Sequence, residues 1–159
     1  IGAFAQLADE FPGWDVQIYG SGREYTTLHQ LITSLGLVGR VSLNLPVHDV
    51  VEVLSGATIY VQPSLAEGFP NAVLDAMACY VSVIVTDYQG NPRDLITHGE
   101  TGVIVPMDDT VALADALREL MRDSMLREDL GRSAGYVREV FSIERITQQW
   151  YDVIHHVLH

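Results

Sequence analysis

Short β-branched runs alternate with longer stretches of helical periodicity along the first two thirds of the chain. The runs predict strands at Val16–Tyr19, Arg40–Leu43, Thr58–Gln62, Ser82–Thr86 and Gly102–Val105. Helices are predicted at Ile1–Glu10, Glu24–Leu35, Val47–Leu54 and Asn71–Ala78, each bounded by Gly, Pro or Asx residues. Repeated units of strand and helix close on a parallel sheet with helices against its faces.

The last third of the chain has a different pattern. It carries helical periodicity with no strand between the helices, at Thr110–Arg122, Met125–Glu139 and Ile143–Leu158. The predicted fold class is therefore α/β: a Rossmann-like, doubly wound parallel sheet followed by C-terminal helices. Residues 1–159 are expected to form a single domain, and ligands of such sheets bind beyond the carboxyl ends of the strands.

The charge of the chain limits its chemistry and its partners. All nine basic residues are Arg, and 21 acidic residues give a formal net charge of −12. The absence of Lys excludes a Schiff-base lysine and the lysine of a phosphate-binding P-loop within this chain. The acidic balance argues against nucleic acid and anionic membranes, which are bound by clustered Lys and Arg.

Metal ligands and membrane spans are also missing from the pattern. Cys79 is the one cysteine, so an internal disulfide and a cysteine-based zinc site are excluded. The six histidines, including His155, His156 and His159 at the end of the last helix, lack the spacing of a metal site. No apolar run approaches the about 20 residues that cross a bilayer. No metal site and no membrane span are expected in this segment.

The most informative motif runs from Pro63 to Ala78, where a predicted strand ends, a glycine turn follows and a helix begins. Glu67 lies in the turn, and the first amides of the helix, at Asn71 and Ala72, suit a phosphate because they lie at the positive end of the helix dipole. Asp75 follows about one turn into the helix. Two carboxylates around an amide cluster describe a site for a sugar attached to a phosphate. The alternative is that Asn71 caps the helix and both acids are solvated.

Two other loops are weaker candidates. Tyr19–Arg23 contains Gly-x-Gly after a predicted strand, which is either a ligand-binding loop or a tight turn. Thr86–Asp94 follows the next strand, so it lies at the same sheet edge as Glu67 and forms either a rim of the pocket or an ordinary surface loop.

These motifs, in this order, resemble the nucleotide-sugar domain of retaining glycosyltransferase family 4. The residues that carry the resemblance are Val61-Gln62-Pro63-Ser64, Glu67-Gly68-Phe69-Pro70, Leu74-Asp75-Ala76-Met77-Ala78-Cys79, Gly90-Asn91-Pro92 and Gly99-x-Thr101-Gly102. The similarity covers nearly the whole chain and continues into the tail at Phe141-Ser142. It implies the C-terminal half of a GT-B fold, with the acceptor-binding domain and the first βα unit upstream of Ile1.

The resemblance assigns roles to individual residues. Glu67 matches the first glutamate of the family signature, which lies by the donor sugar and the reaction centre. Asp75 matches the second glutamate, which holds the ribose hydroxyls. Asn44 matches the segment that reads the edge of the base. The turn whose backbone faces the sugar and the diphosphate corresponds to Gly68, Phe69, Pro70, Asn71 and Ala72.

The chain departs from the family pattern at four places. Asp75 is one methylene shorter than the family's glutamate, and Pro70 offers no amide where many members have glycine. Leu45 replaces a glycine, and Tyr80-Val81-Ser82 replaces a Gly-x-Pro turn. The family's Arg and Lys that stabilise the leaving diphosphate correspond to positions upstream of Ile1.

The resemblance implies a glycosyltransferase that moves a hexose from a UDP- or GDP-sugar to a hydroxyl acceptor with retention, with no cofactor and no metal. The expected partners are the nucleotide sugar and, through the upstream domain, a sugar or glycolipid acceptor. Two alternatives stay open: a sugar-nucleotide epimerase of GT-B architecture and a non-catalytic nucleotide-sugar-binding domain. We expect a cytoplasmic location and a role in polysaccharide biosynthesis, with peripheral contact to the inner membrane left open.

Overall fold

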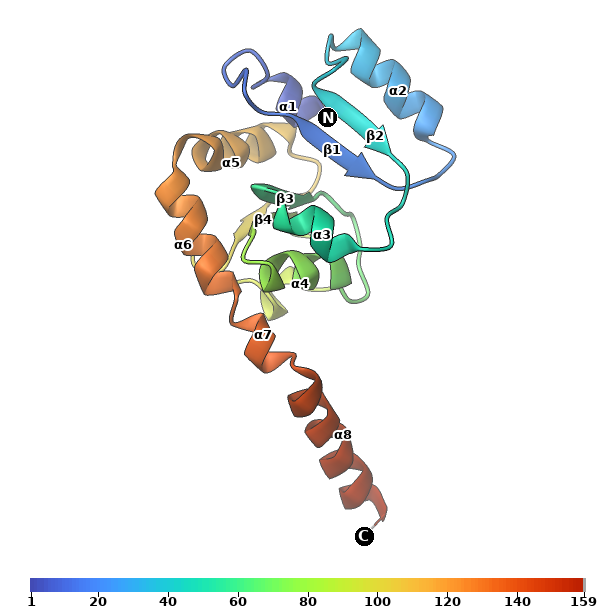
Figure 1. Cartoon of the computed structure of the whole chain (residues 1–159), viewed down its shortest axis with the longest axis vertical. Coiled ribbons are helices and arrows are strands. Elements are labelled where there is room, and N and C mark those ends of the chain that lie inside the picture. Colours follow the sequence, from blue (N-terminus) through green and yellow to red (C-terminus); the bar gives the residue numbers. More distant parts are fainter. Residues whose placement is uncertain (159) are drawn as a thin grey trace.

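The computed structural model describes residues 1–158 and shows two parallel sheets with helices around them (Figure 1). Within this range the strands are β1 (Val16–Tyr19), β2 (Val41–Asn44), β3 (Ile59–Gln62), β4 (Ser82–Thr86) and β5 (Val103–Val105). β1 pairs with β2, and β4 lies between β3 and β5. The doubly wound α/β class is confirmed, with the sheet divided in two. β1 and β3 are joined by packing instead of a ladder, since Ile18 and Ile59 share one apolar cluster.

The helices follow the strands in the expected order. They are α1 (Gly2–Ala5), α2 (Tyr25–Ser34), α3 (Val50–Ser55), α4 (Asn71–Ala78), the 3-10 helix η1 (Pro92–Asp94), α5 (Thr110–Arg122), α6 (Ser124–Ala134), α7 (Val137–Val140) and α8 (Ile143–Leu158). Sequence analysis did not predict η1. It predicted α4, α5 and α8 with the bounds observed.

β4 is the centre of the core, and all five of its residues are buried. Val83 and Val85 pack into the cluster formed with α3, α4 and α7, whereas Ile84 packs on the opposite side with α5 and α6. Side chains alternate between the two faces of a strand, so a strand covered on both faces is apolar throughout. This explains the apolar run Val83–Val85, which lies between the buried polar residues Ser82 and Thr86.

The first helix is shorter than the predicted Ile1–Glu10. After Ala5 the chain continues as turns, beginning with a hydrogen bond from the Gln6 amide to the Ala3 carbonyl at 3.2 Å. The guanidinium of Arg40 donates to the carbonyls of Ala8, at 3.1 Å, and Phe11, at 2.8 Å. Arg40, which directly precedes β2, therefore holds the turns that follow the short helix.

Three other helix predictions were wrong at their ends. The predicted Glu24–Leu35 is Tyr25–Ser34, with Glu24 and Leu35 as its caps. The predicted Val47–Leu54 begins at Val50, because the Asp49 side chain accepts the amide of Glu52 at 3.0 Å and caps the helix there. The predicted Met125–Glu139 is two helices, since α6 ends at Ala134 and α7 begins at Val137. Gly135, the C-cap of α6, passes close to Tyr80: a Cβ there would lie 2.2 Å from the Tyr80 ring.

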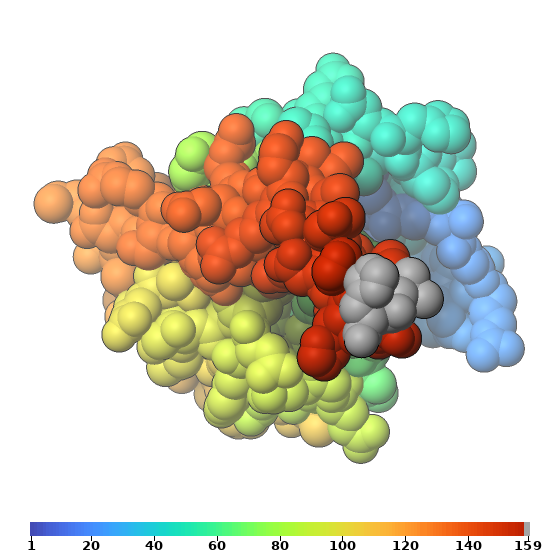
Figure 2. All heavy atoms as spheres, turned by 90° about the horizontal axis from the view of Figure 1, so that it is seen from below, coloured from blue at the N-terminus to red at the C-terminus, as the bar shows by residue number. Residues whose placement is uncertain are grey.

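α7 and α8 extend away from the sheets, with the C-terminal end of α8 farthest from them (Figure 1). Figure 2, seen from below, shows atoms of α8 in front of the rest of the molecule. α8 is amphipathic, and the apolar side chains of Ile143, Trp150 and Val157 are exposed. No helix in the described residues has the length and hydropathy of a membrane span.

Candidate functional site

Two loops meet at the carboxyl ends of β3 and β4. The Glu67 amide donates to the Gln89 carbonyl at 2.9 Å, and the Gln89 amide donates to the Leu65 carbonyl at 3.1 Å. Gly90 has a φ of 120°, and a Cβ there would lie 2.1 Å from the Glu67 carbonyl oxygen. The loop Thr86–Asp94 therefore lies against the Glu67 turn, as its place at the same sheet edge predicted.

The Glu67 carboxylate is half-buried and held through one oxygen. Gln62 Nε2 donates to Glu67 Oε1 at 2.8 Å, and Ser64 Oγ donates to the same atom at 2.6 Å. Gln62 ends β3, and the Ser64 carbonyl accepts the hydroxyl of Thr86 from β4. Both donors are thus fixed by the sheet, and the carboxylate has a defined orientation. Of the two acids that the alternative left solvated, Glu67 is hydrogen-bonded and half-buried, whereas Asp75 is exposed as that alternative expected.

The pKa values of two tyrosines are raised by burial and by the negative charge of this region. Burial, followed by the charges of Glu67 and Asp75, raises the pKa of Tyr60 to about 12. Burial and then Glu67 raise the pKa of Tyr88. Tyr60 also donates its hydroxyl to Gln62 Oε1 at 2.9 Å. Because both acids act on Tyr60, the structure brings the two predicted carboxylates to one region, although Asp75 itself is exposed on α4.

The start of α4 differs from the sequence prediction in one detail. The Asn71 amide is not free, because it donates to the Phe69 carbonyl at 3.0 Å. The N-cap is Pro70, so the alternative in which the Asn71 side chain caps the helix is also wrong. Within residues 1–158 the amides of Gly68, Phe69 and Ala72 donate to no protein group. These amides lie at the positive end of the helix dipole and are available to a ligand.

Phe69 makes a contact that sequence analysis missed. Its ring lies 5.9 Å from that of Phe141, centroid to centroid, at an interplanar angle of 58°. Phe141 follows α7, so this contact joins the turn to the C-terminal helices. The two residues are 72 positions apart, and the available signal was only that an exposed phenylalanine in a polar turn needs an apolar neighbour.

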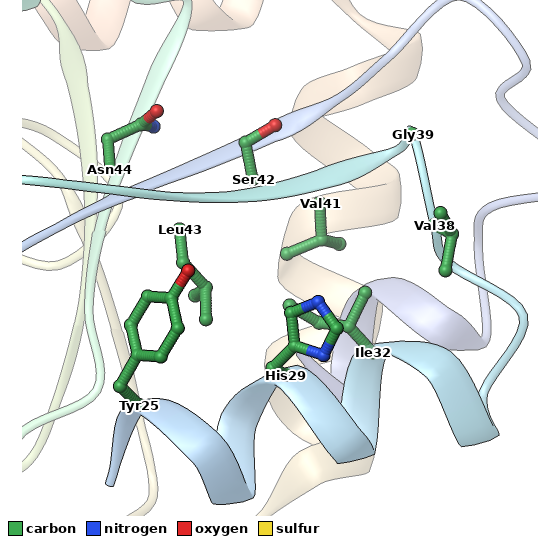
Figure 3. Close-up of a pocket in the computed structure, with 9 residues that line it drawn as sticks. All are labelled: Tyr25, His29, Ile32, Val38, Gly39, Val41, Ser42, Leu43 and Asn44. Carbon is green, nitrogen blue, oxygen red and sulfur yellow. The ribbon is translucent and has the colours of Figure 1, made fainter. Parts of the chain in front are cut away.

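Asn44 lies apart from this group, at the end of β2. Its side-chain Nδ2 donates to Gln17 Oε1 on β1 at 2.8 Å. It also borders a hollow of about 370 Å³ between α2 and β2. Figure 3 shows the rings of Tyr25 and His29 facing β2 across this hollow, while Asn44 is directed to the other side of the strand. Sequence analysis did not predict this hollow.

Metal coordination has no candidate among the described residues. No group of three or more His, Cys, Asp or Glu side chains in residues 1–158 is placed to hold an ion. The His155 ring is tilted at 33° to that of Tyr151, with ring centroids 5.9 Å apart. His159 lies outside the described residues.

Comparison with known sequences decides the family. The sequence profile of glycosyl transferases group 1 matches residues 1–135. The chain belongs to this family. An exopolysaccharide phosphotransferase of Streptomyces coelicolor is 35% identical over 151 residues, which are 94% of this chain and 16% of that protein. N-acetyl-alpha-D-glucosaminyl L-malate synthase of Bacillus anthracis is 32% identical over 157 residues, or 98% of this chain and 41% of that protein. The chain therefore spans less than half of either relative.

The group 1 fold is also found in solved structures. HepE of Anabaena, crystallised in complex with UDP, superposes with a TM-score of 0.89 at 23% identity, over 97% of this chain and 43% of that one. The parallel sheets and flanking helices match the C-terminal Rossmann-like domains of GT-B glycosyltransferases.

One departure from the pattern expected of the family has a visible structural consequence. Tyr80 stands at the first position of the expected Gly-x-Pro turn and adopts a φ of 61°, a left-handed conformation that costs free energy for a residue with a Cβ. Its ring is held under the guanidinium of Arg138, 5.4 Å from the ring centroid. The turn is therefore rebuilt around the tyrosine, at a backbone strain that glycine would avoid.

Proposed function

We propose that this chain is the donor-binding domain of a glycosyltransferase that transfers a hexose from a nucleoside-diphosphate sugar to a hydroxyl acceptor with retention of anomeric configuration. The observation that carries the proposal is the Glu67 carboxylate, held by Gln62 and Ser64 beside the unpaired amides at the start of α4, in a chain of glycosyl transferases group 1.

Each part of the site has a role in this proposal. Glu67 orients the donor sugar at the reaction centre. The amides of Gly68, Phe69 and Ala72 receive the diphosphate, where fixed dipoles stabilise the charge that develops on the leaving group. Asp75, exposed on α4, binds the ribose hydroxyls. Asn44 contributes to the reading of the base.

The relatives support the class of donor. HepE was solved with UDP, and the name of the Bacillus anthracis relative describes the attachment of a glucosaminyl group to L-malate. We extend this to a UDP- or GDP-sugar donor for the present chain, without a metal ion. We also propose that the cations for the diphosphate lie outside these 159 residues, which contain nine Arg and no Lys. The proposed setting is cytoplasmic polysaccharide or glycolipid synthesis, with the acceptor bound by the upstream domain.

Transfer by the full-length protein tests the proposal. Purified protein is incubated with UDP- and GDP-hexoses and candidate hydroxyl acceptors, and the anomeric configuration of the product is read by NMR. We expect transfer with retention, and a fall in kcat of at least about tenfold in Glu67→Gln, because a charge placed for the transition state is removed. Glu52→Gln, at an exposed glutamate of α3, is the matched control.

Incubation with donor alone separates the alternatives. An epimer formed without acceptor would favour the epimerase, and binding without transfer or epimerisation would favour a non-catalytic domain. Transfer that is unchanged in Glu67→Gln would contradict the proposed site.

A further inference from the structure

The hydrogen bonds around Glu67 are distributed unevenly between its two carboxylate oxygens. Oε1 accepts from both Gln62 Nε2 and Ser64 Oγ, at 2.8 and 2.6 Å. Oε2 has no partner among the described residues. A carboxylate that takes both protein donors on one oxygen keeps the other available for a ligand.

The donor at Gln62 is itself oriented. Gln62 is buried, with 9% of its surface exposed, and its side-chain Oε1 accepts the Tyr60 hydroxyl at 2.9 Å. Since a hydroxyl donor occupies the amide oxygen, the NH₂ group must face Glu67. The raised pKa of Tyr60 keeps this hydroxyl protonated, and so able to donate, well above neutral pH.

The donor at Ser64 is fixed from the next strand. Thr86, buried at the end of β4, donates its hydroxyl to the Ser64 carbonyl. The Glu67 backbone is held as well, because its amide donates a hydrogen bond to the Gln89 carbonyl. Both ends of the contact are therefore anchored to the sheet, and rotation of the carboxylate would break two hydrogen bonds together.

We propose that Gln62 and Ser64 are positioning residues, which clamp Oε1 of Glu67 so that Oε2 is the oxygen presented to the donor sugar. Neither touches the substrate in this account, and both act through Glu67. The inference rests on the proposed function of Glu67 and adds which atoms set its orientation. Tyr60 orients Gln62, and Thr86 holds the Ser64 backbone.

The experiment measures kcat and KM in the full-length protein, with kcat normalised to the number of UDP-binding sites. Gln62→Met removes the amide at similar length, and Ser64→Ala removes the hydroxyl. We expect each to lower kcat by about tenfold or more, the size of a lost hydrogen bond to a charged group, with KM for the nucleotide sugar near the wild-type value. Ser64→Thr keeps the hydroxyl and should restore most of kcat.

The matched control is Ser55→Ala, which removes an exposed serine hydroxyl bonded to the Val51 carbonyl in α3. Its kcat should equal that of the wild type. Normalisation to UDP sites removes any loss of kcat caused by unfolded protein. If Ser64→Ala folds poorly, the kcat values of Ser64→Thr and Gln62→Met still test the clamp.

The outcomes separate the clamp from the proposed function. If the wild type transfers sugar, Glu67→Gln does not, and both clamp variants keep wild-type kcat, the clamp is overturned and the function stands. A rise in KM alone would also overturn the clamp, because it would place these residues in substrate binding. If the wild type neither binds UDP or GDP nor transfers sugar, both proposals fail.

Discussion

Gly90 is the residue at which the two loops of the site come closest. Its φ of 120° suits glycine, and the space of its missing Cβ is taken by the Glu67 carbonyl, which would lie 2.1 Å away. Any side chain would therefore push apart the loop and the Glu67 turn. The position of the carboxylate depends on a backbone contact as much as on its own hydrogen bonds.

Gly90→Ala should destabilise the protein by about 1–3 kcal/mol and lower kcat, because the Cβ displaces Glu67 and the positive φ is strained. The free energy of unfolding is measured by urea denaturation. Gly13→Ala is the control, since no atom lies within 4 Å of its Cβ position, and it should leave both quantities unchanged. Wild-type stability in Gly90→Ala would show that the two loops are not in contact.

Tyr60 predicts a pH dependence of stability. Its pKa is raised to about 12 in the folded chain, mainly by burial and then by Glu67 and Asp75. Between pH 10 and 12 the unfolded chain releases this proton while the folded chain keeps it, so the free energy of unfolding falls as pH rises. Tyr60→Phe should flatten that fall, as measured by urea denaturation across this pH range. Parallel curves for the two proteins would contradict the assignment.

At this scale the sequence predicted that Glu67 and Asp75 lie in one region, but not how Glu67 is held. Glu67 and Asp75 were identified because a turn and a helix start have recognisable residues. The free Asn71 amide was wrong, since the bond to Phe69 depends on the turn geometry at Pro70. The contact with Phe141 depends on tertiary packing, which periodicity does not contain.

At the scale of elements, α6 lies very close to the backbone at Tyr80–Ser82, where β4 begins. A Cβ at Gly131 would lie 2.1 Å from the Tyr80 carbonyl oxygen and 3.5 Å from the Ser82 amide nitrogen. The helix can approach the strand only because this residue has no side chain. The turn at Tyr80 and Gly131 of α6 therefore contact each other directly through their backbones.

The change in stability caused by Gly131→Ala tests whether α6 lies this close to the backbone at Tyr80. In an open helix, alanine stabilises relative to glycine by up to about 1 kcal/mol. Here we expect destabilisation of about 1–3 kcal/mol instead, because the clash is with backbone. Thermal and urea denaturation measure it, with Ser133→Ala, exposed on the same helix, as a control that stays near wild type. A gain in stability would refute the close approach of α6.

The pattern of elements was largely predictable, and the errors have a common cause. β1, β4, α4, α5 and α8 have the predicted bounds because a periodic run or a proline and glycine boundary defines them. The first helix was predicted too long because its periodicity continues past Ala5 into turns, which Arg40 holds from 29 residues or more away. The division of the sheet likewise depends on which strands meet in space.

At the scale of the whole molecule, the net charge of −12 and the site have to be considered together. The acidic chain offers helix amides to a diphosphate and no lysine. The Arg of the second loop, Arg93, is engaged with Asp87 at 2.9 Å. If the proposed donor site takes its cations from outside these residues, the 159 residues alone should bind a nucleotide sugar weakly and transfer none.

The most direct test of the central claim is calorimetric titration of UDP and GDP into the full-length protein and its Asp75→Ala variant. We predict that the wild type binds at least one of the two nucleotides and that Asp75→Ala weakens this binding by about tenfold, as expected for the loss of a hydrogen bond from a ribose hydroxyl to a charged group. Absence of binding to either nucleotide, or binding that Asp75→Ala leaves unchanged, would contradict a donor site at the start of α4.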